Sequence, residues 1–151
     1  MSFSYTHFKV KRNMERGRGF TLVELMVAVL IFGILAAVAV PIMRGRVDSG
    51  KWSEANTTAG TIRSAVRTYI AEKGPAYDFS SVEGTLDTAS IYEELGFRGS
   101  DLAGSYFNQS DYEIKSVTAD PPSCVIEVTS THAEGPGGTG TLAADGSWSV
   151  N

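Results

Sequence analysis

The chain has 151 residues, a formal net charge of -4 and a single cysteine, Cys124. This length suits one modest domain, and one cysteine excludes an intrachain disulfide. The only histidines are His7 and His132, with no nucleophile or metal-ligand spacing beside them, so neither an enzyme nor a metal or cofactor site is expected.

The N-terminal residues are basic and the rest of the chain is acidic. Up to Gly19 there are five Lys or Arg residues and one Glu, a net charge of +4, which leaves -8 for the remainder. Positive residues before an apolar span predict a cytoplasmic N-terminus, with the following domain across the membrane. An acidic domain there has no electrostatic reason to bind nucleic acid nonspecifically.

From Phe20 to Met43 the sequence is apolar except for Glu24. These residues would form a helix about 36 Å long, which matches a bilayer core and exceeds the apolar region of a signal peptide. A charge in hydrocarbon is normally paired or functional, so Glu24 indicates more than an anchor. Two simpler interpretations are a secretory signal cut after Ala37-Val38-Ala39 and a plain single-span anchor.

The residues Gly19-Phe20-Thr21-Leu22-Val23-Glu24 closely resemble the processing site of type IV pilins and type II secretion pseudopilins, the class III prepilin signal. The resemblance implies a leader, residues 1–19, that is removed by cleavage after Gly19. It also implies that Phe20 becomes an N-methylated N-terminus. The run that begins at Met14 resembles a complete short leader, so we expect translation to start there.

The same resemblance assigns assembly roles to residues of the apolar segment, 20–43. Glu24 in lipid needs a partner, and the family implies the free amine of Phe20 on a neighbouring subunit. Because cleavage creates that amine, processing should license polymerisation. Gly33 and Pro41 fall where the family interrupts its helix, and both residue types lower the cost of local unwinding.

Residues 44–74 are predicted to continue the helix as an amphipathic segment. Apolar positions at steps of three and four predict one buried stripe, and Gly74-Pro75 predicts its end. The stripe consists of Trp52, Ala55, Ala59, Ile62, Val66 and Tyr69.

Residues 75–110 are predicted to form a connecting region with one short helix. Ser90-Ile91-Tyr92-Glu93 has the Ser-x-x-Glu pattern of a capping box and runs into Leu95-Gly96. The aromatic residues of this region are expected to pin the loop to the core. They are Tyr92, Phe97, Tyr106 and Phe107.

Residues 111–151 are predicted to form three or four antiparallel strands, because apolar and polar residues alternate there. The inward positions are Tyr112, Ile114 and Ser116, then Cys124, Ile126 and Val128. Asp145-Gly146 predicts a hairpin. The glycine-rich loop 132–138 lacks a following helix and a run of carboxylates, so it is expected to join strands, not to bind phosphate or calcium.

Together these elements predict an α+β pilin fold, with a long helix packed on a small sheet. The resemblance implies a structural subunit of a type IV pilus. The alternatives are a pseudopilin of a type II secretion system and a minor pilin of a DNA-uptake machine. The implied partners are copies of the chain and other pilins, a prepilin peptidase and methyltransferase, an inner-membrane assembly platform and membrane lipid. The implied locations are the bacterial inner membrane, with the N-terminus cytoplasmic, and then a surface pilus or periplasmic pseudopilus.

Overall fold

The computed structural model describes residues 19–151, which fall into two units divided between Val40 and Pro41. Helix α1, Leu22–Lys73, runs through both units. The expected leader up to residue 18 and the expected start at Met14 lie outside the described residues.

In the second unit, α1 buries the stripe that its sequence predicts. All six stripe positions are buried, and Ile70 is buried beside them. The helix ends as predicted: Gly74 has a φ of +81°, which glycine adopts without a Cβ clash, and its N–H donates to the Ile70 carbonyl at 2.9 Å.

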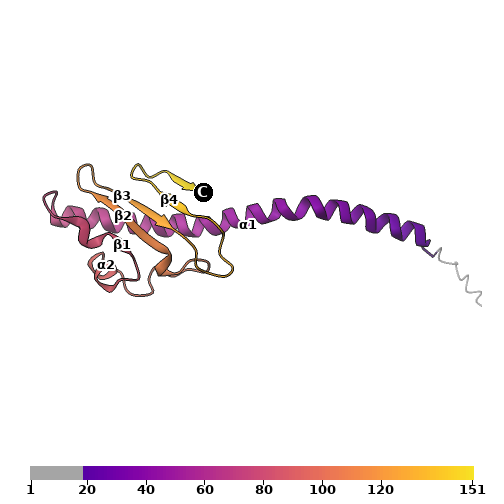
Figure 1. The fold of residues 1–151 in the computed structure, drawn as a ribbon, viewed down its shortest axis with the longest axis horizontal. Helices are drawn as coiled ribbons and strands as arrows, with labels where there is room; N and C mark the ends of the chain where they lie inside the picture. The colour runs from indigo at the N-terminus through magenta and orange to yellow at the C-terminus, as the bar shows by residue number, and fades with distance from the viewer. Residues whose placement is uncertain (1–18) are drawn as a thin grey trace, which may run out of the picture. The chain divides into compact units, whose positions relative to one another are not determined.

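The second unit holds a five-stranded antiparallel sheet in the order β1-β2-β3-β4-β5 (Figure 1). Four strands lie in the region predicted to form the sheet. They are β2 (Tyr112–Thr118), β3 (Ser123–Val128), β4 (Gly140–Leu142) and β5 (Trp148–Val150). The fifth, β1 (Gly84–Thr85), falls in the connecting region and was not predicted, because two residues carry no readable period.

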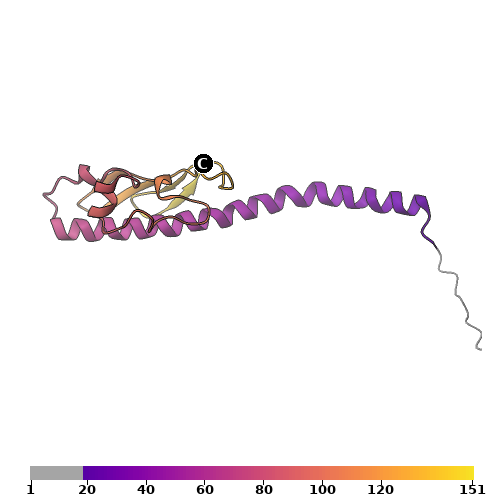
Figure 2. The ribbon, with the colours of Figure 1, turned by 90° about the horizontal axis from the view of Figure 1, so that it is seen from below.

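In the second unit, the sheet lies on one side of α1 (Figure 2). The inward side chains of β3, Cys124, Ile126 and Val128, are buried against it, as predicted. The α+β fold expected from the sequence is therefore confirmed.

The alternation predicted for β2 holds only in its first half. Tyr112 and Ile114 are buried, but the pairing with β3 shifts register between Ile114 and Ser116. This bulge reverses the side-chain alternation, so Ser116 is exposed and Val117 is half-buried. The expected inward position of Ser116 was wrong.

The connecting region contains a 3-10 turn at Phe79–Val82, helix α2 (Ala89–Glu94) and a second 3-10 turn at Gln109–Asp111. The short helix was predicted, but its capping box was wrong: Thr88 is the N-cap, so Ser90 lies inside the helix. The four aromatic residues of the region are buried or packed on the core, as expected.

Candidate functional site

The candidate site is the start of α1, where the cleavage and assembly residues were predicted. Gly19 and Phe20 precede the helix, and the Phe20 side chain is 84% exposed. The Thr21 carbonyl accepts the Leu25 N–H at 3.1 Å, which closes the first helical turn. The predicted scissile bond therefore lies in non-helical chain just before the helix.

Glu24 lies in the first turn of α1 and is exposed. Its backbone N–H donates to Thr21 Oγ1 at 3.2 Å, so Thr21 caps the helix. The Thr-x-x-Glu spacing is the capping-box pattern, and a negative charge is favoured near a helix N-terminus. The local role of Thr21 was missed, although the spacing from Thr21 to Glu24 contains the signal.

No described cation pairs with Glu24, since the ion pairs within residues 19–151 involve only Lys51 and Lys115. The described residues therefore leave this carboxylate without a counter-charge. Gly33 and Pro41 both lie inside α1, which is a continuous helix through both.

The apolar side chains of residues 20–43 are not covered by any described part of the protein. From Phe20 to Met43 the large apolar residues are 48–84% exposed. By length and composition, α1 is the one helix within the described part of the chain that qualifies as a membrane span. So much apolar surface would be strongly unfavourable in water, so lipid or other helices must cover it.

The rest of the described chain offers little for chemistry. Residues 19–151 contain no cluster of His, Cys, Asp and Glu suited to a metal ion. Cys124 is buried in β3, and burial raises the pKa of its thiol. His132 lies in the β3–β4 loop, where its Nδ1 accepts the Glu134 N–H at 3.2 Å.

The fold and the exposed apolar helix define a class of protein: an α+β domain attached to an N-terminal membrane anchor. Residues 14–40 match the family described as the prokaryotic N-terminal methylation motif. The chain is 36% identical over 81 residues to the type IV narrow pilus major component PilA5 of Thermus thermophilus, covering 51% of this chain and 70% of that protein. The chain belongs to the type IV pilin family.

Two further relatives are also pilus or fimbrial proteins. Identity to the type IV major pilin protein PilA of Myxococcus xanthus is 38% over 96 residues, which is 64% of this chain and 43% of the relative. Identity to the fimbrial protein EcpB of Eikenella corrodens is 31% over 98 residues, 64% of this chain and 61% of the relative. The chain thus spans about half the length of these two relatives. No solved structure matches it.

Proposed function

We propose that the chain is a non-enzymatic structural subunit of a type IV pilus. The observation that carries the proposal is the bare apolar helix with Glu24 as its single charge, four residues after Phe20. The relatives named above are pilus and fimbrial proteins, which favours a pilus filament over a type II secretion pseudopilus or a DNA-uptake minor pilin.

Maturation is proposed to begin with cleavage between Gly19 and Phe20 by a prepilin peptidase, followed by N-methylation of Phe20. Cleavage removes a segment with a net charge of +4 and leaves an amine next to the apolar helix. Before assembly, residues 20–43 span the inner membrane, with the N-terminus on the cytoplasmic side.

Assembly is proposed to pair the Glu24 carboxylate with the Phe20 amine of a neighbouring copy at the inner-membrane platform. A carboxylate at the centre of a bilayer costs from roughly 2.5 kcal/mol upward, so pairing of a carboxylate within the membrane favours docking and fixes the axial register. The Thr21 cap holds the start of the helix, and therefore Glu24, in a defined geometry. Gly33 and Pro41 supply the positions where the helix can unwind in the filament.

The test is intact and N-terminal peptide mass spectrometry on protein sheared from the cell surface. Abundant chain that starts at N-methylated Phe20 is the expected result. A Gly19→Ala variant should leave full-length precursor in the membrane, which ties the new N-terminus to the glycine.

Three outcomes would count against the proposal. A start at Val40, after Ala37-Val38-Ala39, would mean ordinary secretion. Processed chain confined to the envelope would favour a pseudopilin or minor subunit. Normal mature protein from Gly19→Ala would remove the cleavage assignment.

A further inference from the structure

Within residues 19–151, the sheet ends at β5, and the outer edge of this strand pairs with no other described strand. Thr139 and Asn151 exchange both backbone hydrogen bonds at 3.0 Å, and Ala143 N–H donates to the Ser147 carbonyl at 2.9 Å. Bonded and non-bonded pairs alternate along an antiparallel ladder, so Ser149 bonds to β4 while Trp148 and Val150 do not. Both residues therefore present their N–H and C=O groups to the open side.

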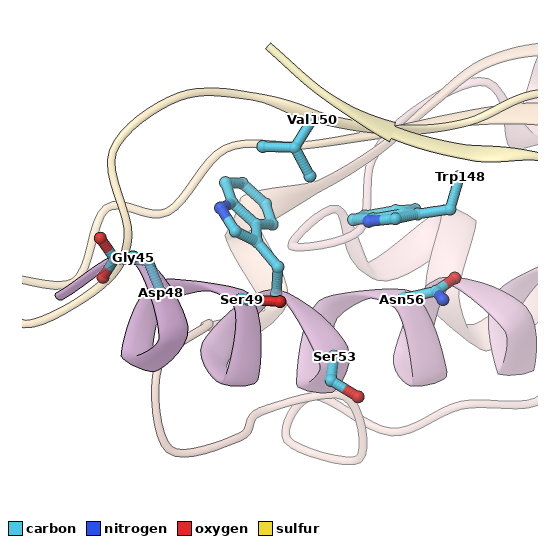
Figure 3. Close-up of a pocket in the computed structure, with 8 residues that line it drawn as sticks. Gly45, Asp48, Ser49, Ser53, Asn56, Trp148 and Val150 are labelled. Carbon is cyan, nitrogen blue, oxygen red and sulfur yellow. The ribbon is translucent and has the colours of Figure 1, made fainter. Parts of the chain in front are cut away.

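A groove of about 490 Å³ lies beside this edge, between β5 and α1 (Figure 3). Trp148 and Val150 form its apolar wall together with Trp52. The two indoles lie 6.1 Å apart, and a Cβ at Gly140 would come within 2.8 Å of the Trp52 ring, so the glycine makes room for them. The α1 side is polar and is formed by Gly45, Asp48, Ser49, Ser53 and Asn56.

The opposite edge strand of the sheet, β1, presents fewer free main-chain groups. Gly84 and Leu86, the residue after β1, direct their main-chain groups toward β2. Only Thr85 directs its N–H and C=O away from β2. The Thr85 carbonyl already accepts the Thr88 N–H at 3.2 Å. The edge strand β5, by contrast, contains no proline or charged residue of the kind that usually blocks strand addition.

We propose that β5 and this groove bind an extended segment of a partner polypeptide, which adds to the sheet as a sixth strand. Two N–H and two C=O groups provide the main-chain bonds, as in other cases of strand addition. Alternate side chains of the segment enter the groove against Trp148 and Val150.

The charge of the groove favours a basic residue in that segment. Asp48 is the one charged lining residue, and its side chain is 51% exposed. Lys51 lies 3.7 Å from the carboxylate but makes its shorter contact, 2.6 Å, with the Glu134 carbonyl. Asp48 therefore retains acceptor capacity for an incoming cation.

Antiparallel pairing with the β5 strand of a second copy is the less suitable arrangement for this edge. From Trp148 to Val150 the strand passes from above Asn56 to above Ser49, opposite to the direction of α1 (Figure 3). Antiparallel pairing of two β5 strands would therefore reverse one α1 relative to the other. Two chains anchored in the same membrane cannot adopt that arrangement, an argument that rests on the proposed function.

The test uses the full chain in detergent micelles and a capped peptide, Lys-Thr-Val-Thr-Val-Thr-Lys. Without peptide, the Ser149 amide should exchange slowly and those of Trp148 and Val150 fast. At about 1 mM peptide, exchange at Trp148 and Val150 should slow by about tenfold or more. The matched control is the same peptide with N-methylated central valines, which keeps the side chains and loses the donors.

Val150→Pro is the decisive protein variant. The Val150 N–H does not bond to β4, so the variant should keep its thermal midpoint and lose peptide binding. Ser149→Pro should instead destabilise the sheet, because that N–H bonds to Thr141.

Three results would overturn the proposal. They are no protection by the peptide, equal protection by the N-methylated peptide, and a dimer of the chain that Val150→Pro abolishes. Peptide binding is measured on the purified chain, so it can be absent while surface filaments with processed Phe20 still form. Peptide binding can equally be present while no filaments form. The two proposals are therefore tested separately.

Discussion

Glu24 combines a local role with a proposed intermolecular one. Its backbone completes the Thr21 cap, while its carboxylate has no ion-pair partner among residues 19–151. A negative charge is favoured near the start of a helix. The Thr21 cap itself uses only the Glu24 backbone N–H, so it does not require an ionised side chain at this position.

Substitution of Glu24 by Ala and by Gln separates the two roles. If pairing with an amine drives assembly, both variants should be processed normally and both should lower incorporation by about tenfold or more, the equivalent of about 1.4 kcal/mol. The readout is the ratio of sheared to membrane-bound chain in cells lacking the native subunit. Wild-type yield from Glu24→Gln would assign the role to capping alone.

Tyr112 is fully buried at the start of β2, and its hydroxyl has no hydrogen-bond partner among the described residues. Burial raises the pKa of Tyr112 to about 12. In the unfolded chain this tyrosine ionises near its ordinary pKa of about 10. Its contribution to the free energy of unfolding is therefore fully present below about pH 10 and is lost as the pH rises toward about 12.

Tyr112→Phe should remove the part of the loss of stability at alkaline pH that comes from ionisation of this hydroxyl. At pH 7 the free energy of unfolding should change by less than about 1 kcal/mol, because no bonded hydroxyl is lost. At pH 11 the variant should be more stable than wild type, by an amount on the order of 1 kcal/mol. Denaturant titrations at the two pH values measure this. A loss above about 1 kcal/mol at pH 7 would mean that the hydroxyl bonds to a neighbour such as Thr58.

Among the secondary-structure elements, those with a clear period were predictable. The α1 stripe and the β3 alternation each repeat over several residues, so the buried faces could be assigned before any coordinates. The bulge in β2 and the two-residue β1 have no such repeat. Their placement depends on pairing across the sheet, which a local pattern does not contain.

Asp111 illustrates a contact that sequence reasoning missed, because one of its partners, Thr131, lies 20 residues further along the chain. The buried carboxylate accepts the Asn108 N–H at 2.7 Å, the Thr131 N–H at 3.0 Å and the Thr131 hydroxyl at 2.7 Å. These bonds tie the start of β2 to the loop between β3 and β4. From the sequence alone, an aspartate in a polar stretch is interpreted as an ordinary turn residue. Its role becomes visible only when the loop between β3 and β4 is known to lie beside it.

Asp111→Ala should therefore destabilise the second unit by about 2–4 kcal/mol, since three donors lose their acceptor. Chemical denaturation followed by tryptophan fluorescence measures the loss. Asp145→Ala is the matched control: its carboxylate also accepts a backbone N–H and a hydroxyl, both from Ser147, but it is exposed. Equal losses for the two variants would contradict a special role for burial.

The two units of the chain differ in what they need from their surroundings. Every buried apolar residue of the core lies between Trp52 and Leu142, so the second unit contains its own core. The described part of the first unit, residues 19–40, has exposed apolar side chains and depends on lipid or neighbouring helices. Folding and assembly therefore rest on different segments of the sequence.

This division predicts that a fragment of residues 44–151 is soluble and folded but forms no filament. Circular dichroism should give a cooperative thermal transition, and sedimentation should give a monomer. A fragment that starts at Ser53 is the control, because it loses Trp52, whose ring lies 5.2 Å from Phe107 and 6.1 Å from Trp148. It should be less stable by about 3 kcal/mol or more, as expected for loss of a buried aromatic side chain. If the longer fragment aggregates or lacks a transition, the second unit needs the apolar helix to fold, and the separation of folding from assembly is wrong.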